Sequence, residues 1–266
     1  MPFFLCLDEM NLAPVEQYFA QYLSVVETRH LNKNGVIESD PIIKLEKKYC
    51  DQLADMLYPQ SDSDEDGANR AKLKEKFKNM KYEIPLPKNL IVMGTVNMDE
   101  TTFGFSRKVL DRAMTIEMNE VDLAGGLEDT DKERFGIAAA DILPTAVEGK
   151  DVYAENKELC DKVIGYLQQV NDVLEDTPFK IAYRTRNEFL VYAVNRGEDN
   201  LTEALDEMTS MKILSRIEGD QDKVGHVLEG LEQVMMASGL AEDGLSRKKV
   251  KAMAKRLNSG YTSYWN

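Results

Sequence analysis

Two short, continuous apolar runs, each followed directly by acidic or amide side chains, most constrain the fold of this chain. Phe3–Leu7 precedes Asp8 and Glu9, and a second run over residues 89–96 ends at Asn97. Runs of this length without alternation are typical of strands buried on both faces of a parallel sheet. We therefore expect both strands in an α/β domain, with their carboxyl ends at one edge of the sheet.

Helical patterning dominates the rest of the chain. Apolar residues recur at three and four positions over residues 15–28, which predicts an amphipathic helix. In the second half, strand signals fade and helices are expected over residues 155–176, 186–196, 201–215, 221–238 and 246–258. We expect a boundary near residues 119–126, with an α/β domain over residues 1–120 and an all-α domain over residues 121–266.

The segment between the two strands has a pattern of its own. Asn34-Gly35 is a type I′ turn signal and predicts a β-hairpin within residues 30–45. Beyond it we expect a helix, an acidic run that forms an exposed or disordered loop, and a second helix, over residues 46–58, 61–67 and 69–80.

Composition disfavours several classes of protein. The net charge is −14, so the chain is a poor candidate for direct DNA binding, although a local basic patch stays open. Cysteines and histidines lie far apart and lack metal-ligand spacing, which predicts reduced thiols in a cytoplasmic protein and disfavours zinc: they are Cys6, Cys50, Cys160, His30 and His226. The apolar start is too short for a signal peptide or a membrane span.

The polar residues after the two strands have a chemical and a plain interpretation. Asp8 and Glu9 could hold a metal shell and orient an attacking water, and Asn97 could bind that water and a γ-phosphate. The plain interpretation is a helix cap or solvated acids for the pair and an ordinary turn residue for Asn97. Each signal alone favours the plain interpretation.

Two arginines lie on a short helix expected over residues 106–112, just before a third strand expected over residues 114–118. Arg107 and Arg112 are of the type that stabilises charge on a transferring phosphoryl group. The alternative is a surface ion pair with Asp111 or with Glu117, and in isolation it is favoured.

In combination these segments resemble AAA+ nucleoside triphosphatases of the McrB-like branch, which have a dynein-related or MoxR-type AAA domain. Leu7–Ala13 (LDEMNLA) and Leu23–Arg29 (LSVVETR) resemble the family's Walker B strand and next helix. Gly94–Thr102 (GTVNMDETT) and Phe105–Ala113 (FSRKVLDRA) resemble its sensor 1 and arginine-finger segments. The resemblance implies the C-terminal half of an AAA+ P-loop core, with an insertion before sensor 1 at residues 30–88.

The resemblance also implies a role for each candidate residue. Asp8 would hold Mg²⁺ through water and Glu9 would orient the attacking water, as the Walker B pair. Asn97 would be sensor 1. An arginine finger is implied at Arg112, with Arg107 as a nearby candidate.

The second half of the chain resembles the all-α lid of the same family. Phe179–Arg184 looks like the start of the helix that carries sensor 2, which implies Arg184 near the γ-phosphate, with Arg186 as a second candidate. A surface arginine at a helix N-terminus stays open as the alternative. Lys212–Gly219 and Gly260–Trp265 look like packing elements of the lid.

The phosphate-binding loop of the family is absent, and no GxxxxGK[ST] motif occurs in the 266 residues. That loop supplies the N–H groups, the lysine and the magnesium-binding hydroxyl that hold phosphates. We therefore expect an N-terminally truncated fragment that starts at Walker B and hydrolyses no nucleotide by itself. Mg²⁺ and ATP or GTP belong to the full-length parent, and we expect none bound tightly to this chain.

Two functions stay open. In the first, the parent is a ring-forming nucleoside triphosphatase, with restriction or defence and a McrC-like nuclease partner as analogies. In the second, the chain is a non-catalytic remnant or an interaction module. Strands with bare edges invite pairing with another chain, so we expect a dimer or higher oligomer through residues 3–8 or 90–96. We expect no direct DNA binding by this segment and no membrane association.

Overall fold

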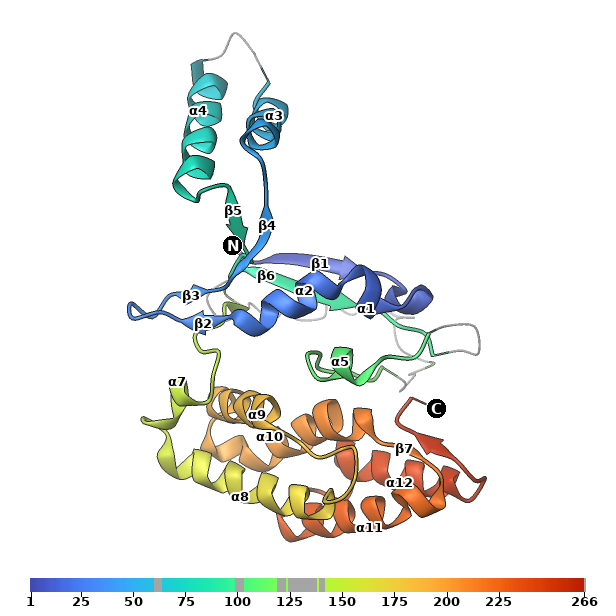
Figure 1. Cartoon of the computed structure of the whole chain (residues 1–266). Coiled ribbons are helices and arrows are strands. Elements are labelled where there is room, and N and C mark those ends of the chain that lie inside the picture. The colour runs from blue at the N-terminus through green and yellow to red at the C-terminus, as the bar shows by residue number, and fades with distance from the viewer. Residues whose placement is uncertain (60–63, 99–102, 119–122, 124–137, 139–141, 266) are drawn as a thin grey trace.

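The computed structural model describes residues 1–59, 64–98, 103–118, 123, 138 and 142–265. Over these residues helices dominate and the strands form four two-stranded sheets, so the chain belongs to a helix-rich, mixed α/β class. Figure 1 shows three parts, namely a thin α/β layer, an arm that projects from it, and a helical domain on the opposite side.

The two apolar runs form a parallel pair of strands. β1 (Phe3–Leu7) and β6 (Leu90–Gly94) pair in register over their whole length. The prediction of two parallel strands is therefore confirmed, but the prediction that both faces are buried is wrong. Phe3 and Phe4, which point to opposite faces, are 60% and 57% exposed. Within the described residues no third strand pairs with either edge.

The helix expected over residues 15–28 is interrupted. It forms as two short helices and a 3₁₀ turn: α1 (Val15–Tyr18), α2 (Ala20–Val25) and η2 (Val26–Thr28). The break lies at Phe19, whose ψ of 9° leaves the helical region. These elements and α5 (Arg107–Leu110) share a small apolar core formed by Val15, Leu23 and Val109.

Residues 30–38 form the predicted hairpin, with β2 (His30–Leu31) antiparallel to β3 (Ile37–Glu38). The pairing is shorter than the expected residues 30–45. Gly35 has a φ of 70°, a conformation in which glycine avoids the clash that a Cβ would cause.

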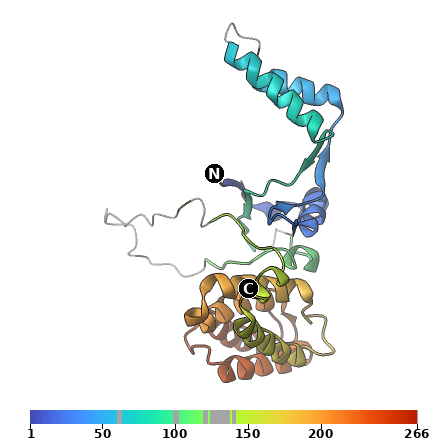
Figure 2. The ribbon, with the colours of Figure 1, turned by 90° about the vertical axis from the view of Figure 1, so that its left-hand side faces the viewer.

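Residues 41–85 form the arm, which extends away from the other two parts in both views (Figures 1 and 2). Its stem is the antiparallel pair β4 (Pro41–Lys44) and β5 (Glu83–Pro85), and its outer part is the helix pair α3 (Lys47–Leu57) and α4 (Asp64–Asn79). Part of the expected acidic loop is thus helical. Acidic residues in a first helical turn are favoured by the helix dipole, which explains why α4 begins inside that run.

The C-terminal part is a helical domain around one apolar core. Its helices are α7 (Lys150–Tyr153), α8 (Lys157–Val173), α9 (Tyr183–Arg196), α10 (Leu201–Met208), α11 (Gln221–Ala237) and α12 (Leu245–Leu257). Apart from α7 they match the five segments predicted from periodicity, although α9 begins three residues and α12 one residue before the predicted start. Leu174, Val224 and Met253 in this core are fully enclosed.

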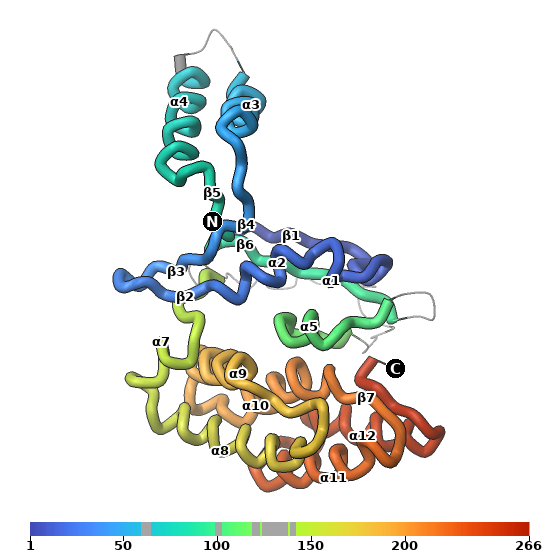
Figure 3. Tube along the Cα trace, viewed as in Figure 1, coloured from blue at the N-terminus to red at the C-terminus, as the bar shows by residue number. Residues whose placement is uncertain are grey.

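Between α10 and α11 the chain forms a π-helical turn, η4 (Thr209–Ile213), and a 3₁₀ turn, η5 (Leu214–Arg216). β7 (Glu218–Gly219) then pairs with β8 (Thr262–Ser263). The chain end returns toward α5, where the ring of Trp265 lies 5.7 Å from that of Phe105 (Figure 3). The predicted domain boundary near 119–126 lies almost entirely outside the described residues.

The predicted strand over residues 114–118 is wrong. These residues form neither a helix nor a strand, and their backbone contacts the helical domain instead of the sheet. The Thr115 N–H donates to the Met211 carbonyl at 3.3 Å, and the Lys212 ammonium donates to the Ala113 carbonyl at 2.8 Å. The helical domain therefore takes one backbone group of this segment, the Thr115 N–H, and the carbonyl of Ala113 just before it.

Candidate functional site

The acidic residues after β1 lie beside the end of β6. Because the two strands are parallel, Asp8 and Glu9 come next to Thr95. The Thr95 hydroxyl donates to the Asp8 carboxylate at 2.5 Å and accepts the Glu9 N–H at 2.9 Å. One hydroxyl thus joins both acidic residues to the second strand.

Asn97 approaches the same edge. Its amide nitrogen donates to Oε1 of Glu9 at 3.4 Å, a long hydrogen bond. Glu9 has a φ of 48°, a left-handed conformation that costs a non-glycine residue about 1–2 kcal/mol. Strain of this kind concentrates at functional sites.

The pairing of β1 with β6 and the hydrogen bonds of Thr95 and Asn97 bring Asp8, Glu9 and Asn97 to one edge of the sheet, as predicted from the two strand ends.

Asn11 supports this group and is absent from the predicted site. Only 1% of it is exposed, and its side-chain amide donates to the Asn97 carbonyl at 2.8 Å and to the Phe103 carbonyl at 3.3 Å. The side chain thereby holds the segment that carries Asn97 against the segment that carries Glu9. A polar residue between Met10 and Leu12 was the available signal.

The donor set at this edge is compatible with magnesium held through water. Among the described residues no group of three or more His, Cys, Asp or Glu side chains converges. Mg²⁺ in phosphoryl-transfer sites takes one or two carboxylates, several waters and the phosphates of the substrate. Asp8, with the Thr95 hydroxyl beside it, fits the carboxylate part of that set, and the remaining ligands would be water and nucleotide.

Arg112 is held by its own chain. Its guanidinium forms an ion pair with Glu27 and donates to the Leu23 carbonyl at 2.9 Å and to the Lys108 carbonyl at 2.5 Å. The side chain is 12% exposed, and this burial lowers its pKa. In this conformation Arg112 joins α2 to α5, so its predicted role as an arginine finger would require these contacts to open.

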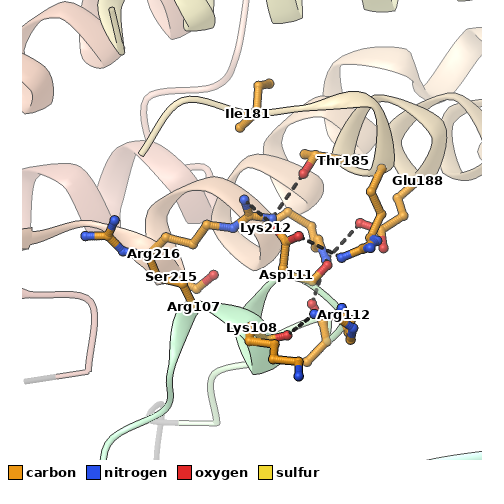
Figure 4. Close-up of polar contacts among 12 residues, drawn as sticks. Arg107, Lys108, Asp111, Arg112, Ile181, Thr185, Glu188, Lys212, Ser215 and Arg216 are labelled. Atoms are coloured by element: carbon orange, nitrogen blue, oxygen red, sulfur yellow. Dashed lines mark hydrogen bonds and ion pairs between the residues drawn. The ribbon is translucent and has the colours of Figure 1, made fainter. Parts of the chain in front are cut away.

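Arg184 lies at the first turn of α9, as predicted, and reaches two carboxylates of the α/β layer. It contacts Glu27 at 2.5 Å and Asp111 at 2.7 Å. Asp111 also forms an ion pair with Arg216 at 2.9 Å, and the Arg216 guanidinium donates to the Thr185 hydroxyl at 3.0 Å. These contacts form a polar cluster between the α/β layer and the helical domain (Figure 4).

Lys212 completes this interdomain cluster. Its side chain is fully buried, and its ammonium contacts Glu188 at 2.8 Å, the Ala113 carbonyl at 2.8 Å and the Asp111 carbonyl at 3.1 Å. Burial lowers the pKa of Lys212 and raises the pKa of Glu188. Sequence reasoning assigned Lys212–Gly219 to packing and missed this buried charge.

Arg107 and Arg186 lie apart from the Glu9 group. Arg107 donates to the Pro178 carbonyl at 3.2 Å and lies 5.4 Å from the ring centre of Phe179. Arg186 lies over the ring of Tyr183 at 4.9 Å.

A cleft of about 500 Å³ lies between the α/β layer and the helical domain. Its polar lining includes Glu16, Ser106, Arg107, Ser215, Arg216 and Glu218.

Comparison with known proteins adds one similarity. Residues 140–261 match a family model described as Domain of unknown function (DUF8727), so most of the helical domain is similar to that family. No curated protein and no solved structure matches the chain. Over the described residues, none of the helices combines the length and the apolar character that a bilayer span requires.

Proposed function

We propose that this chain carries the metal and water half of the active site of an AAA+ nucleoside triphosphatase of the McrB-like branch. The observation that supports this most is the meeting of Glu9 and Asn97, which lie 88 residues apart in sequence and follow two paired parallel strands. A carboxylate and an amide at adjacent strand ends are suited to positioning a water for attack on a γ-phosphate.

Each residue at this edge has a chemical task in the proposal. Asp8 would hold Mg²⁺ through water, and the metal would supply charge neutralisation on the phosphates of ATP or GTP. Glu9 accepts a hydrogen bond from the attacking water and removes its proton. Asn97 donates to Glu9 and to the water, and the buried Asn11 keeps Asn97 in place.

The arginines would supply positive charge from two sides. Arg184 is the proposed sensor 2, and it exchanges the carboxylates of Glu27 and Asp111 for the γ-phosphate of the same subunit. Arg107 is more accessible than Arg112 and is the better placed to reach a neighbouring subunit of a ring. Arginine suits both tasks because its planar donors match phosphate oxygens.

The proposal assigns the phosphate-binding half to a segment other than these 266 residues, since they contain no GxxxxGK[ST] motif. Both faces of β1 are exposed, at Phe3, Phe4 and Leu5, and its outer edge pairs with no described strand, which supports a position for further elements of a larger core beside this pair. A McrC-like nuclease partner and a role in restriction belong to the same proposal.

A second candidate is a non-catalytic interaction module. It is favoured by one observation, namely that Glu27 engages both Arg112 and Arg184. With these two cations paired to a carboxylate, the arrangement is complete as an interdomain contact and needs no nucleotide.

Hydrolysis assays separate the two candidates. The 266-residue chain should show no ATP or GTP turnover. If the gene encodes an in-frame GxxxxGK[ST] upstream, the longer polypeptide should turn over nucleotide, and Glu9→Gln should abolish turnover while nucleotide binding persists. Glu229→Gln, on the exposed side of α11, is the matched control and should leave turnover unchanged.

Two outcomes would count against the first candidate. Turnover by the longer polypeptide that survives Glu9→Gln would remove Glu9 from the mechanism. An upstream stop codon, together with an inactive chain, would favour the interaction module.

A further inference from the structure

The outer helix pair of the arm presents an unpartnered apolar face. Four exposed side chains of α3 share one side of that helix by their spacing: Tyr49, Leu53, Met56 and Leu57. We call them the α3 stripe. Met56 is 78% exposed, whereas Cys50 and Ala54 are fully buried on another side of α3. Packing between α3 and α4 therefore leaves the stripe uncovered.

The charged residues of the arm are also distributed unevenly along its length. Its inner half, residues 44–52 and 72–83, contains eight lysines and four acidic residues, a net charge of +4. Its outer half, residues 53–59 and 64–71, contains four acidic residues and one arginine, a net charge of −3. The charge of the described arm thus changes sign along its length, whereas the whole chain carries −14.

We propose that two copies of this chain associate through their arms, with the α3 stripes packed antiparallel about a two-fold axis. An apolar patch meeting the same patch of a second copy is the isologous contact that two-fold symmetry produces. The antiparallel direction places the basic inner half of each arm beside the acidic outer half of the other. A parallel arrangement would oppose like charges along the whole contact.

The shape of the molecule suits this arrangement. The arm projects away from the acidic remainder of the chain (Figures 1 and 2). The 16 residues of α4 span about 24 Å at 1.5 Å per residue. Antiparallel arms keep the two acidic parts at opposite ends of the contact, beyond the Debye length of about 8 Å at physiological salt. Repulsion between them is therefore largely screened.

A nucleic acid partner would explain fewer features of the arm than a second copy of the chain does. Exposed lysines of α4, such as Lys72, Lys76 and Lys78, would attract phosphates, but the acidic outer half would repel them. The α3 stripe would also stay exposed to water. A second copy covers the stripe and neutralises both halves, and this inference does not depend on the proposed nucleotide site.

Disulfide trapping tests the contact in the full chain. Leu53 lies at the centre of the stripe, so the two-fold axis places it opposite itself. In a Cys6→Ser background, Leu53→Cys should give a disulfide-linked dimer under mild oxidation. The native Cys50 and Cys160 are buried. Ala68→Cys is the control, because Ala68 is exposed and lies half a helical turn away from the buried Phe77 on α4.

Sedimentation velocity over a dilution series gives a second readout. Met56→Glu should shift the dimer to monomer, and Lys47→Glu combined with Lys48→Glu should weaken it. Association through the sheet would instead respond to Phe4→Glu, which should leave the Leu53→Cys crosslink intact. Equal crosslinking of Leu53→Cys and Ala68→Cys would overturn the proposal.

A nucleic acid partner would give a different pattern. Binding of a labelled duplex by a monomeric protein, lost in Lys72→Glu combined with Lys76→Glu, would assign the arm to nucleic acid and overturn the proposal. Under the proposed contact, this variant should change self-association and show no duplex binding to lose.

Discussion

The carboxylate of Glu27 lies 2.5 Å from the guanidinium of Arg184, although 157 residues separate them in sequence. Glu27 belongs to η2 at the end of the α2 segment, and Arg184 belongs to the first turn of α9. Their ion pair therefore joins the α/β layer directly to the helical domain.

The Glu27–Arg184 contact should contribute a measurable but small coupling. Both side chains are about one-third exposed, so solvent screening limits the coupling energy to about 0.5–1 kcal/mol. A double-mutant cycle with Glu27→Gln and Arg184→Gln in urea unfolding measures it. The more exposed pair Lys162–Glu198 is the control and should couple less. Coupling no larger than that of the control would show that the contact does not hold the two parts together.

Removal of the Lys212 charge should be far more costly. Lys212→Met leaves Glu188 and the carbonyls of Asp111 and Ala113 buried without their cation. Breaking a buried charge pair typically costs about 3–5 kcal/mol. Lys248→Met, at an exposed lysine of α12, should change the free energy of unfolding by about 0.5 kcal/mol or less. Similar urea midpoints for the two variants would contradict the buried-pair account.

Glu188 should make stability depend on pH in an unusual direction. Burial raises its pKa above the ordinary 4.5, so the folded state binds the proton more readily than the unfolded state. The Glu188 contribution is therefore most favourable below pH 4.5 and is lost as pH rises through the folded pKa. Glu188→Gln should remove this component from urea midpoints measured across that range. Parallel pH profiles for the wild type and the variant would refute it.

Association through the sheet should be sensitive to Phe4. This residue is 57% exposed on β1, whose outer edge pairs with no described strand. Phe4→Glu places a charge on that surface. In a Met56→Glu background, which lacks the arm contact, it should reduce any remaining dimer or higher oligomer seen by size-exclusion chromatography with light scattering. A strictly monomeric wild type at high concentration would exclude this contact.

Features with a local cause could be predicted from the sequence. The helices of the C-terminal domain follow from apolar residues spaced at three and four, which one helix face buries. Asp8, Glu9 and Asn97 meet because parallel strands end at one edge of a sheet. Neither inference needs the position of a distant residue.

Features with a distant cause could not be predicted. The partner of Arg112 is Glu27, which lies on a different element, so the sequence left surface pairing and catalysis both open. Residues 114–118 have a strand-like composition, but Met211 takes the Thr115 N–H and Lys212 takes the carbonyl of Ala113 just before them. The burial of Lys212 depends on three separate segments and has no signature in its own neighbourhood.

The position of Lys212 bears on how this polypeptide can be divided. The region similar to the unknown-function family starts at residue 140, yet the Lys212 ammonium takes two backbone carbonyls from residues 111 and 113. A polypeptide cut at the edge of the family match would keep the cation and the Glu188 carboxylate but lose two of its three oxygen partners. Folding of the helical domain is therefore tied to the segment before it, and the smallest autonomous unit should include residues 111–113.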